Sequence, residues 1–274
     1  MKLCKRNSND PLLRTFVDHY GLHLLPIPRE KISLGDLFVT DGKNVSAPGN
    51  IKDLLTPPIK IPKKSSNEEM GNIAGKFSNS LNFQLGLNLL ENFLRALGVG
   101  DAALKLELGF NKNRNGSVRF AFQDPRRDSA NVILMGTELI KTKIDSKHPI
   151  FNPGYKYYLT TATVKSSSIS ISTESADSNQ GMYDLSAFDA VRSDGKVQIS
   201  ASQDGAITFQ GSKSLIFGVE LHELELDEQS NSIYLTIPDS AITVRTKQTD
   251  LEIPTVLIGG ETGDAFLDYS DKGL

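Results

Sequence analysis

Apolar and polar residues alternate over long runs between positions 155 and 226. A period of two is the pattern of strands that have one apolar and one polar face. Asp204-Gly205 lies between two of these runs and favours a hairpin, because the tight turns that join hairpin strands need positive φ. The stretch therefore predicts several long strands joined in part by short turns. Its alternating apolar residues include Ile169, Ile171, Val197, Ile199, Ala201, Ile207, Phe209, Leu215, Phe217, Val219 and Leu221.

The polar positions of these runs are mostly serine, threonine and glutamine, where lysine and glutamate would be more usual. Two interpretations follow from this pattern. In the first, an ordinary antiparallel sheet places its apolar face on the core and its hydroxyl groups in water. In the second, the strands can enter a bilayer, where about 9–11 alternating residues span the membrane and the strand edges must close. The pattern is compatible with both. The hydroxyl residues are Ser166, Ser167, Ser168, Ser170, Ser172, Ser200, Ser202 and Thr208.

The rest of the chain predicts further elements. Residues 81–98 have apolar residues at spacings of three and four and form the clearest helix. A second helix is expected over 11–20, and a short helix or irregular segment over 182–191. Residues 43–80 contain several prolines and are expected to be irregular. The prediction is an α+β fold with a mainly antiparallel sheet and peripheral helices. Other strands are expected at 22–27, ending at Pro26 and Pro28, and at 37–40, 104–110, 118–122, 131–144, 233–237 and 241–245, with a turn at Asn115-Gly116.

Composition narrows the classes of function. The chain has 274 residues, a formal charge of −3 and a single cysteine. The absence of a basic field argues against nucleic acid as a partner. One cysteine permits no intrachain disulfide and indicates a reducing cytosolic compartment. The first residues lack the apolar segment of a secretory signal, and no run approaches the roughly 20 apolar residues of a transmembrane helix.

Two basic clusters are candidates for contact with anionic lipid. Cys4 lies among basic residues and is either an incidental thiol or a site of S-acylation, which together with basic residues gives useful membrane affinity. The second cluster is either a solvated loop or a contact with lipid headgroups. The basic residues are Lys2, Lys5 and Arg6 in the first cluster, and Lys60, Lys63 and Lys64 in the second.

The last 25 residues are acidic and partly apolar. Six acidic residues against one lysine give residues 250–274 a formal charge of −5, so the remainder of the chain carries +2. An acidic, glycine-containing terminus is often disordered. Apolar residues such as Val256, Leu257, Ile258 and Phe266 disfavour exposure to water. We therefore expect this tail to dock on the main body.

No catalytic, cofactor or metal motif is present in the sequence. The segment His222-Glu223-Leu224-Glu225 lacks the second histidine of a zinc helix, and there is no G-x-S-x-G, P-loop or G-x-G-x-x-G. The sequence therefore predicts a protein that is not an enzyme and has no cofactor or metal. A hydrolase stays open only if two carboxylates meet in a cleft at roughly 5–9 Å.

The N-terminal 40 residues resemble the start of bacterial gasdermins. The resemblance lies in Cys4-Lys-Arg, Asp10-Pro-Leu-Leu, the string from Tyr20-Gly-Leu-His to Pro-Ile-Pro-Arg29, and Gly35-Asp36-Leu37. Chain length, the early helix, the sheet-rich middle and the short C-terminal tail are similar as well. The resemblance implies a pore-forming domain over residues 1–248 that contains a twisted central antiparallel sheet. It also implies that a short C-terminal segment, residues 249–274, keeps this domain inactive.

The resemblance also implies a function in anti-phage defence. A protease encoded nearby removes the tail, and the freed monomers assemble on anionic inner-membrane lipid into a large β-barrel pore that kills the cell. The intact chain would be a cytoplasmic monomer, and Cys4 would match a palmitoylated cysteine of the family. Two hairpins per subunit would span the bilayer, and our candidates are residues 131–172 and 196–226. Cleavage is expected within residues 246–260, where Lys247, Asp250 and Leu251 are candidate specificity residues. The alternative is a soluble β-rich binding or scaffold protein with no membrane activity.

Overall fold

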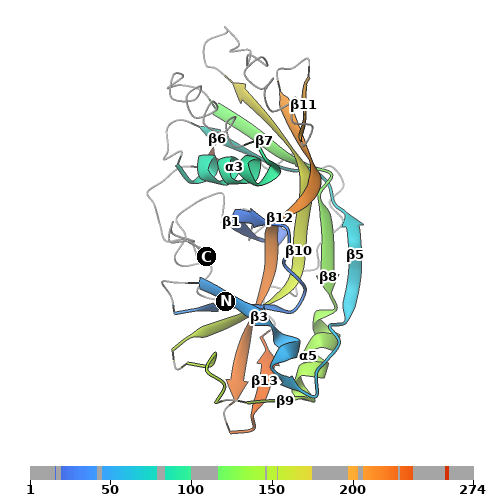
Figure 1. Cartoon of the computed structure of the whole chain (residues 1–274), viewed down its shortest axis with the longest axis vertical. Helices are drawn as coiled ribbons and strands as arrows, with labels where there is room; N and C mark the ends of the chain where they lie inside the picture. The colour runs from blue at the N-terminus through green and yellow to red at the C-terminus, as the bar shows by residue number, and fades with distance from the viewer. Residues whose placement is uncertain are drawn as a thin grey trace.

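The computed structural model describes residues 16, 20–41, 45–78, 84–99, 117–145, 147–152, 154–174, 197–202, 206–227, 229–236 and 257–258. Within these ranges the protein is mostly β, with a curled twelve-stranded sheet, a separate two-stranded sheet and two α-helices (Figure 1). All strand pairs except one are antiparallel. The predicted antiparallel sheet is confirmed.

The elements follow one another in chain order. The strands of the first half are β1 (His23–Arg29), β2 (Asp36–Thr40), β3 (Val45–Asn50), β4 (Leu55–Thr56), β5 (Lys63–Glu69) and β6 (Ile73–Ser78), with the 3-10 turn η1 (Ile51–Asp53) after β3. Helix α3 (Gln84–Leu97) precedes β7 (Ser117–Gln123) and β8 (Arg126–Ala130), and α5 (Val132–Ile140) follows. The remaining strands are β9 (Lys143–Ile144), β10 (Lys156–Glu174), β11 (Val197–Ala201), β12 (Ile207–Asp227), β13 (Ser232–Leu235) and β14 (Leu257–Ile258).

Two long strands, β10 and β12, run through the centre of the sheet. They contain 19 and 21 residues and pair with each other from Tyr157↔Leu224 to Ile171↔Ile207. The separate apolar runs near 207 and 215 therefore belong to one strand. The intervening Gly211-Ser-Lys-Ser continues that strand, since backbone pairing does not require an apolar side chain at every second position.

The two ends of β10 have different neighbours. Towards its C-terminal end, β10 pairs with β7, which pairs with β6. Towards its N-terminal end, β10 pairs with β8 and then with β2. Strand β12 also pairs with β1, β11 and β13 at different positions along its length. We call the part with β6, β7 and β11 the α3 end, and the part with β2, β13 and β9 the α5 end (Figure 1).

The strand predicted over 131–144 is wrong, because most of this segment is helix α5. The side chain of Asn131 accepts a hydrogen bond from Leu134 N and caps the helix. Buried Met135 and Leu139 are four residues apart, which is helical spacing. A short apolar run is compatible with a strand or with a helix, and the cap at Asn131 was the missed signal.

The prediction of irregular structure over 43–80 is also wrong. Strand β5 consists of polar residues, six of them exposed, and pairs with β8 through the backbone. A polar edge strand of this kind has no apolar alternation to reveal it. Strand β1 likewise continues past Pro26 and Pro28 to Arg29. Its pairing with β12 shifts register between Leu24 and Arg29, and bulges on edge strands accommodate proline.

The helix predicted over 81–98 is confirmed as α3. Its buried residues Leu90, Phe93, Leu94 and Leu97 face the sheet. Gly98 ends the helix with φ of +100°, and Val99 N donates to Leu94 O at 2.8 Å. Of the helix expected over 11–20, only Phe16 and Tyr20 are described, and both are helical. The segments expected at 104–110, 182–191 and 241–245, and the turn at Asn115-Gly116, lie outside the described residues.

Two large apolar clusters lie on the sheet. The α3 core joins α3 to β1, β6, β7, β10, β11 and β12, and the α5 core joins α5 to β2, β4, β9, β10, β12 and β13. The α3 core includes Leu24, Ile73, Phe93, Phe120, Phe122, Ile169, Phe209 and Phe217. The α5 core includes Leu37, Val39, Leu55, Met135, Leu139, Tyr157, Leu159, Leu224 and Ile233.

Candidate functional site

Strands β6, β7, β10, β11 and β12 are paired with one another at the α3 end of the sheet. Strand β6 pairs with β7 from Ile73↔Phe122 to Ser78↔Ser117, and α3 lies between these two strands in the chain. Strand β10 pairs with β12, and β11 pairs with β12 from Val197↔Gly211 to Ala201↔Ile207. The first candidate hairpin, residues 131–172, is wrong, because its first residues form helix α5 and β10 pairs with strands outside the segment, among them β7 and β12. The second, residues 196–226, contains the hairpin of β11 and β12.

Helix α3 covers this strand arrangement through aromatic packing. The ring of Phe93 lies 4.9 Å from the ring of Phe122 and 6.3 Å from that of Phe217, edge to face in both cases. Phe122 and Phe217 stack with their ring centroids 3.8 Å apart. All three side chains are fully buried. Phe93 thus packs helix α3 against both β7 and β12.

A glycine on β12 permits close approach of α3. A Cβ atom added at Gly211 would lie 2.7 Å from Cδ2 of Leu97, which is closer than real contacts allow. The helix therefore sits directly on the strand backbone at this position. Gly211 and Leu97 together fix how closely α3 lies on the sheet.

The serines of the alternating pattern on β10 divide in two: Ser166 and Ser168 are buried, while Ser167, Ser170 and Ser172 are half-buried. Three threonines of the same strand are buried as well. Thr160, Thr161 and Thr163 are at most 2% exposed, and Ser166 and Ser168 are also buried. Ser166 Oγ donates to Gln123 O at 2.6 Å and to Ser168 O at 2.8 Å. The strand is covered on both faces from Thr160 to Val164. The hydroxyls of Thr161 and Ser166 form internal hydrogen bonds, whereas Thr160 Oγ1 is buried without a protein partner.

The same stretch, Thr160–Ser168, separates the two cores, and we call it the waist. The pairing of β10 with β12 shifts register three times between these residues. Ion pairs join the neighbouring strands here. Arg127 of β8 pairs with Glu220 of β12, and Lys165 Nζ donates to Asp128 Oδ2 at 2.8 Å. Burial raises the pKa of Asp128, but hydrogen bonds from Lys165 and from Asn67 N outweigh it and leave the pKa below its usual value.

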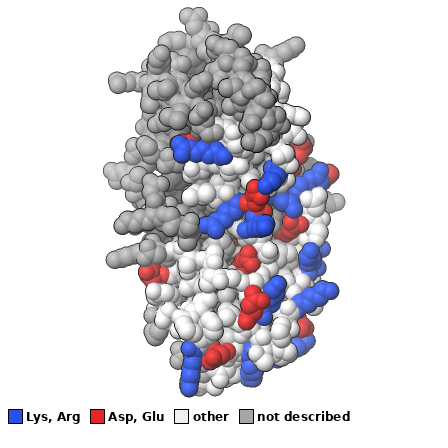
Figure 2. All heavy atoms as spheres, viewed as in Figure 1, with Lys and Arg blue, Asp and Glu red and all other residues white. Residues whose placement is uncertain are grey.

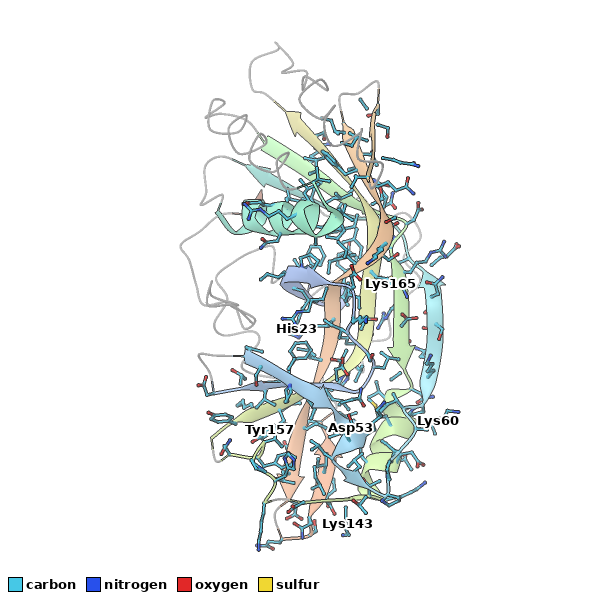
Figure 3. All side chains as sticks on the ribbon, viewed as in Figure 1. His23, Asp53, Lys60, Lys143, Tyr157 and Lys165 are labelled. Atoms are coloured by element: carbon cyan, nitrogen blue, oxygen red, sulfur yellow. The ribbon has the colours of Figure 1, made fainter. Side chains whose placement is uncertain are left out.

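Two buried histidines lie beside the waist. Burial, together with the nearby His222, lowers the pKa of His23 to about 4 (Figure 3). Burial also lowers the pKa of His222, although Glu220 opposes the shift. The Oγ1 atom of Thr161 lies 2.8 Å from His222 Nδ1, within hydrogen-bonding distance. Both imidazoles are therefore neutral at pH 7.

The second basic cluster lies on strand β5 and just before it. Lys60, Lys63 and Lys64 are exposed, and Lys63 and Lys64 belong to β5, where a loop was one expectation. Figure 2 shows basic and acidic side chains interspersed along the side of the molecule that carries β5 and β8. Arg126 of β8 pairs with Glu69 at 2.6 Å within this surface. Lys63 and Lys64 are thus presented to solvent by an edge strand, and Lys60 by the segment that precedes it.

The C-terminal tail contributes one strand to the sheet. Leu257 and Ile258 form β14, which pairs in parallel with β6 at Lys76 and Phe77. Strand β14 stands at the end of the strand order β1-β12-β10-β7-β6-β14. The outer edge of β6 is therefore paired with the tail at these two positions.

Several predicted site residues lie outside the described residues. They are Cys4, Lys2, Lys5 and Arg6 near the N-terminus, and Lys247, Asp250 and Leu251 in the expected cleavage region. Within the described ranges, no cluster of three or more His, Cys, Asp or Glu side chains is arranged to hold a metal ion. No helix in the described part of the chain is long and apolar enough to cross a membrane.

Sequence reasoning missed the pairing of β6 with β7. Its signal was present, since Val118, Phe120 and Phe122 alternate on β7 and Ile73 and Phe77 lie at positions of equal parity on β6. The 38 residues between the two strands hid the pairing, because short hairpins are the pattern that sequence turns reveal.

Comparison with known proteins identifies the family. The sequence model of the Bacterial Gasdermin Family matches residues 25–232. A gasdermin of Vitiosangium sp. (strain GDMCC 1.1324) is 25% identical over 244 residues, which cover 87% of this chain and 88% of that protein. A gasdermin of Bradyrhizobium tropiciagri is 22% identical over 274 residues, covering 98% of this chain and 99% of that protein.

The fold gives the same result. The solved structure of a bacterial gasdermin from Bradyrhizobium tropiciagri superposes with a TM-score of 0.64 at 16% sequence identity, covering 84% of this chain and 92% of that chain. At this identity the likeness is one of fold. The family match extends over more than half of the sequence and includes the strands of both cores. The chain therefore belongs to the bacterial gasdermin family.

Proposed function

We propose that this chain is a pore-forming effector of anti-phage defence that is inactive until a protease, encoded nearby, removes its C-terminal tail. The observation that carries the proposal is the tail strand β14 on the outer edge of β6. Strand β6 is one of the paired strands at the α3 end, and an unpaired strand edge is a template for another chain. A tail that occupies this edge opposes pairing between copies.

Removal of the tail would change charge as well as pairing. Residues 250–274 have a formal charge of −5, and the whole chain has −3. Cleavage would therefore leave the domain of residues 1–248 with a formal charge of about +2. Each basic residue near an anionic surface contributes about 1 kcal/mol, so the change favours binding to anionic inner-membrane lipid. Cleavage within residues 246–260, with Lys247, Asp250 and Leu251 as candidate specificity residues, would produce this form.

The paired strands supply the membrane-spanning element of the proposal. After release of α3, two hairpins would lengthen. The first consists of β6 and β7. The second consists of the α3-end halves of β10 and β12 together with β11. The corrected candidates are thus β6 with β7, which flank residues 79–116, and β12 with its two neighbours β10 and β11, which flank residues 175–196. Alternating apolar residues such as Ile169, Ile171 and Phe209 would face lipid, and pairing with neighbouring copies would close the strand edges into a barrel.

A lipid anchor would concentrate the protein at the bilayer. We propose palmitoylation of Cys4, supported by Lys2, Lys5 and Arg6 beside it and by the exposed Lys60, Lys63 and Lys64. The intact protein would be a cytoplasmic monomer, and the cut protein would be an oligomer in the inner membrane.

Dye release from vesicles tests the proposal. A specific protease site is inserted near Leu251, and phosphatidylglycerol-containing vesicles loaded with dye receive the chain before and after cutting. Release only after cutting is the expected result. The same chain treated with an inactive protease is the control. A folded, cut protein that releases no dye would overturn the proposal and favour a soluble β-rich binding protein.

A further inference from the structure

Helix α5 has apolar side chains on both of its faces. Met135 and Leu139 are buried against the sheet. Away from the sheet, Ile133, Leu134 and Ile140 are 73%, 52% and 56% exposed, and we call these three residues the outer face of α5. A surface helix normally carries polar residues on the side that faces water, so an apolar outer face indicates contact with a partner.

Helix α5 lies beside β13, the last described strand before the region proposed to be cut (Figure 1). Met135 and Leu139 share the α5 core with Ile233 of β13. Thr236 N donates to the backbone of β12 at 2.9 Å, so the chain is held on the sheet up to this residue. Lys247, the first candidate specificity residue, is 11 positions further along the chain. The helix therefore lies next to the strand from which the chain continues to the cleavage region.

The number of residues between β13 and the cleavage region suits the size of a protease. An extended backbone spans at most about 3.3–3.6 Å per residue, so Lys247 can lie up to roughly 40 Å from Thr236, and Leu251 up to roughly 50 Å. A folded domain of 200–250 residues is about 40–45 Å across. A protease bound to the outer face of α5 can therefore receive a bond of this region in an active site on another side of its own surface.

Basic residues lie around the outer face of α5. Lys63 pairs in register with Ala130, immediately before the helix cap Asn131, so the start of β5 lies beside the start of α5. Residues 59–64 and 131–144 together contain five lysines and one glutamate, a formal charge of +4 in a chain of −3. Two copies that paired through this face would bring like charges together, which disfavours a symmetric dimer. The face is complementary to a partner that has an apolar patch with an acidic border.

We propose that the outer face of α5 is a docking site for the activating protease, remote from the bond that the protease cuts. The inference rests on the proposed function, which supplies the protease. Stable complexes bury about 800 Å² on each partner, and three aliphatic side chains provide only part of this area. The contact is therefore transient, and the segment in the active site supplies the remainder until it is cut. The intact chain stays a monomer, and the lysines around α5 become free to face lipid once the protease leaves.

Cleavage kinetics of the full-length chain test the proposal. The probe is the recombinant protease encoded beside the gene, and Ile133 and Leu134 are replaced together by glutamine, which preserves helix propensity. We expect kcat/KM to fall about tenfold or more, mainly through a higher KM, because these side chains touch the protease and not the reacting bond. Ile27→Gln, at an apolar residue of β1 that is 48% exposed, is the matched control and should be cut like the parent chain.

An engineered site separates docking from access to the bond. A recognition sequence for an unrelated protease is inserted near Leu251, both in the parent chain and in the Ile133 and Leu134 variant. The unrelated protease should cut both chains at the same rate. Slower cutting of the variant would show that the substitutions alter the cleaved segment itself, and would overturn the docking site. An unchanged kcat/KM with the neighbouring protease, or an equal loss for Ile27→Gln, would overturn it as well.

Opposite charges at one position test the acidic border of the partner. Leu134→Glu and Leu134→Lys remove the same apolar contact, but only the glutamate is repelled by acidic groups. Leu134→Glu should therefore have the lower kcat/KM, and the difference should shrink at high salt. An equal loss for the two variants, or a lower kcat/KM for Leu134→Lys, would contradict an acidic partner surface.

The two proposals fail in different ways. Dye release after the engineered cut, together with a neighbouring protease that leaves the parent uncut or cuts parent and variant alike, would overturn the docking site and leave pore formation intact. Slow cutting of the variant by the neighbouring protease, with no dye release from either chain after the engineered cut, would support the docking site and overturn pore formation. Equal cutting with dye release lost in the variant alone would assign the outer face to the assembled protein or the membrane, and so overturn the docking site.

Discussion

The two helices pack on the same curled sheet but present opposite kinds of surface to solvent. Helix α3 buries Leu90, Phe93 and Leu94, while on its outer side Arg95 forms an ion pair with Glu91. Helix α5 buries Met135 and Leu139 but exposes isoleucine and leucine. Burial explains every large apolar side chain that the structure describes on α3, namely Leu90, Phe93, Leu94 and Leu97. On α5, Met135 and Leu139 are buried, but the three exposed residues Ile133, Leu134 and Ile140 indicate a contact that the isolated chain does not make.

The difference extends to the strands beneath the helices. Around α3, within the described residues, the sheet ends in strand pairs that pack against α3 and the helical residues Phe16 and Tyr20, and the edge of β6 is paired with the tail strand β14. Around α5 a second small sheet, β4 with β9, and strands β2, β3 and β13 surround the core. The waist between the two cores is bulged and contains buried polar groups, and a third, smaller apolar cluster that includes Leu25, Ile216 and Val219 packs beside it. We infer that the α3 end can loosen while the α5 end stays folded.

Truncation of Phe93 tests this separation with the largest expected effect. Phe93→Ala removes the ring that contacts both Phe122 and Phe217, and should lower the free energy of unfolding by about 3–5 kcal/mol. Amide exchange measured by mass spectrometry should speed up in β6, β7 and β11. Strands β2 and β13 should keep their protection until global unfolding. Equal loss of protection in both regions would show that the cores are one cooperative unit.

Acid should weaken the junction between the two regions. Burial and His222 lower the pKa of His23 to about 4 in the folded chain, against an ordinary value of 6.5. Between these pH values the unfolded chain binds a proton that the folded chain does not, so stability is present above pH 6.5 and is lost towards pH 4. The loss from this one group is roughly 3 kcal/mol.

Urea denaturation at several pH values measures this effect. His23→Gln should reduce the fall in unfolding free energy between pH 7 and pH 4.5, and the fall that remains should include the contribution of His222, whose pKa is also lowered by burial. His148→Gln, at an exposed histidine, should retain the fall. If the His23 variant loses stability with acid as steeply as the parent chain, the effect arises elsewhere.

Much of the sheet was predictable, because local alternation reports a strand with one apolar face. Strand β10 and helix α3 were found in this way, since Ile169 and Ile171 on the strand and Leu90, Phe93 and Leu97 on the helix follow the periods of their elements. Strand β5 was missed because its lysines, serines and glutamates form a strand only through pairing with β8. Tertiary context overrode local preference at this edge.

The candidate site was predictable only in part. The basic cluster at Lys60, Lys63 and Lys64 was visible in the sequence, but its neighbour was not. Residues 131–144 are equally compatible with a strand, and only the cap at Asn131 and the packing of Met135 distinguish a helix with a second, exposed apolar face. The long-range register between Lys63 and Ala130 then brings the two features together.

The contact between Gly211 and Leu97 gives the smallest of the expected effects and the sharpest test of how α3 is held. A methyl group at position 211 would overlap Cδ2 of Leu97, so Gly211→Ala should cost about 1–2 kcal/mol of unfolding free energy. In a Leu97→Ala background the overlap is gone, and the same change should be neutral or slightly stabilising, because alanine lowers the conformational entropy of the unfolded chain. The coupling energy of this double-mutant cycle should therefore be about 1–2 kcal/mol.

Gly218→Ala is the matched control for this cycle. A Cβ atom at position 218 of the same strand would lie 3.6 Å from Leu22, an ordinary contact, and should show no coupling to Leu97. If coupling appears at Gly218 and not at Gly211, α3 does not rest on β12 at Gly211. Coupling at Gly211 alone would mean that a single glycine sets the distance between the helix and the paired strands. In that case Gly211→Ala should also accelerate dye release by the cut chain, because it loosens α3 and leaves the α5 core unchanged.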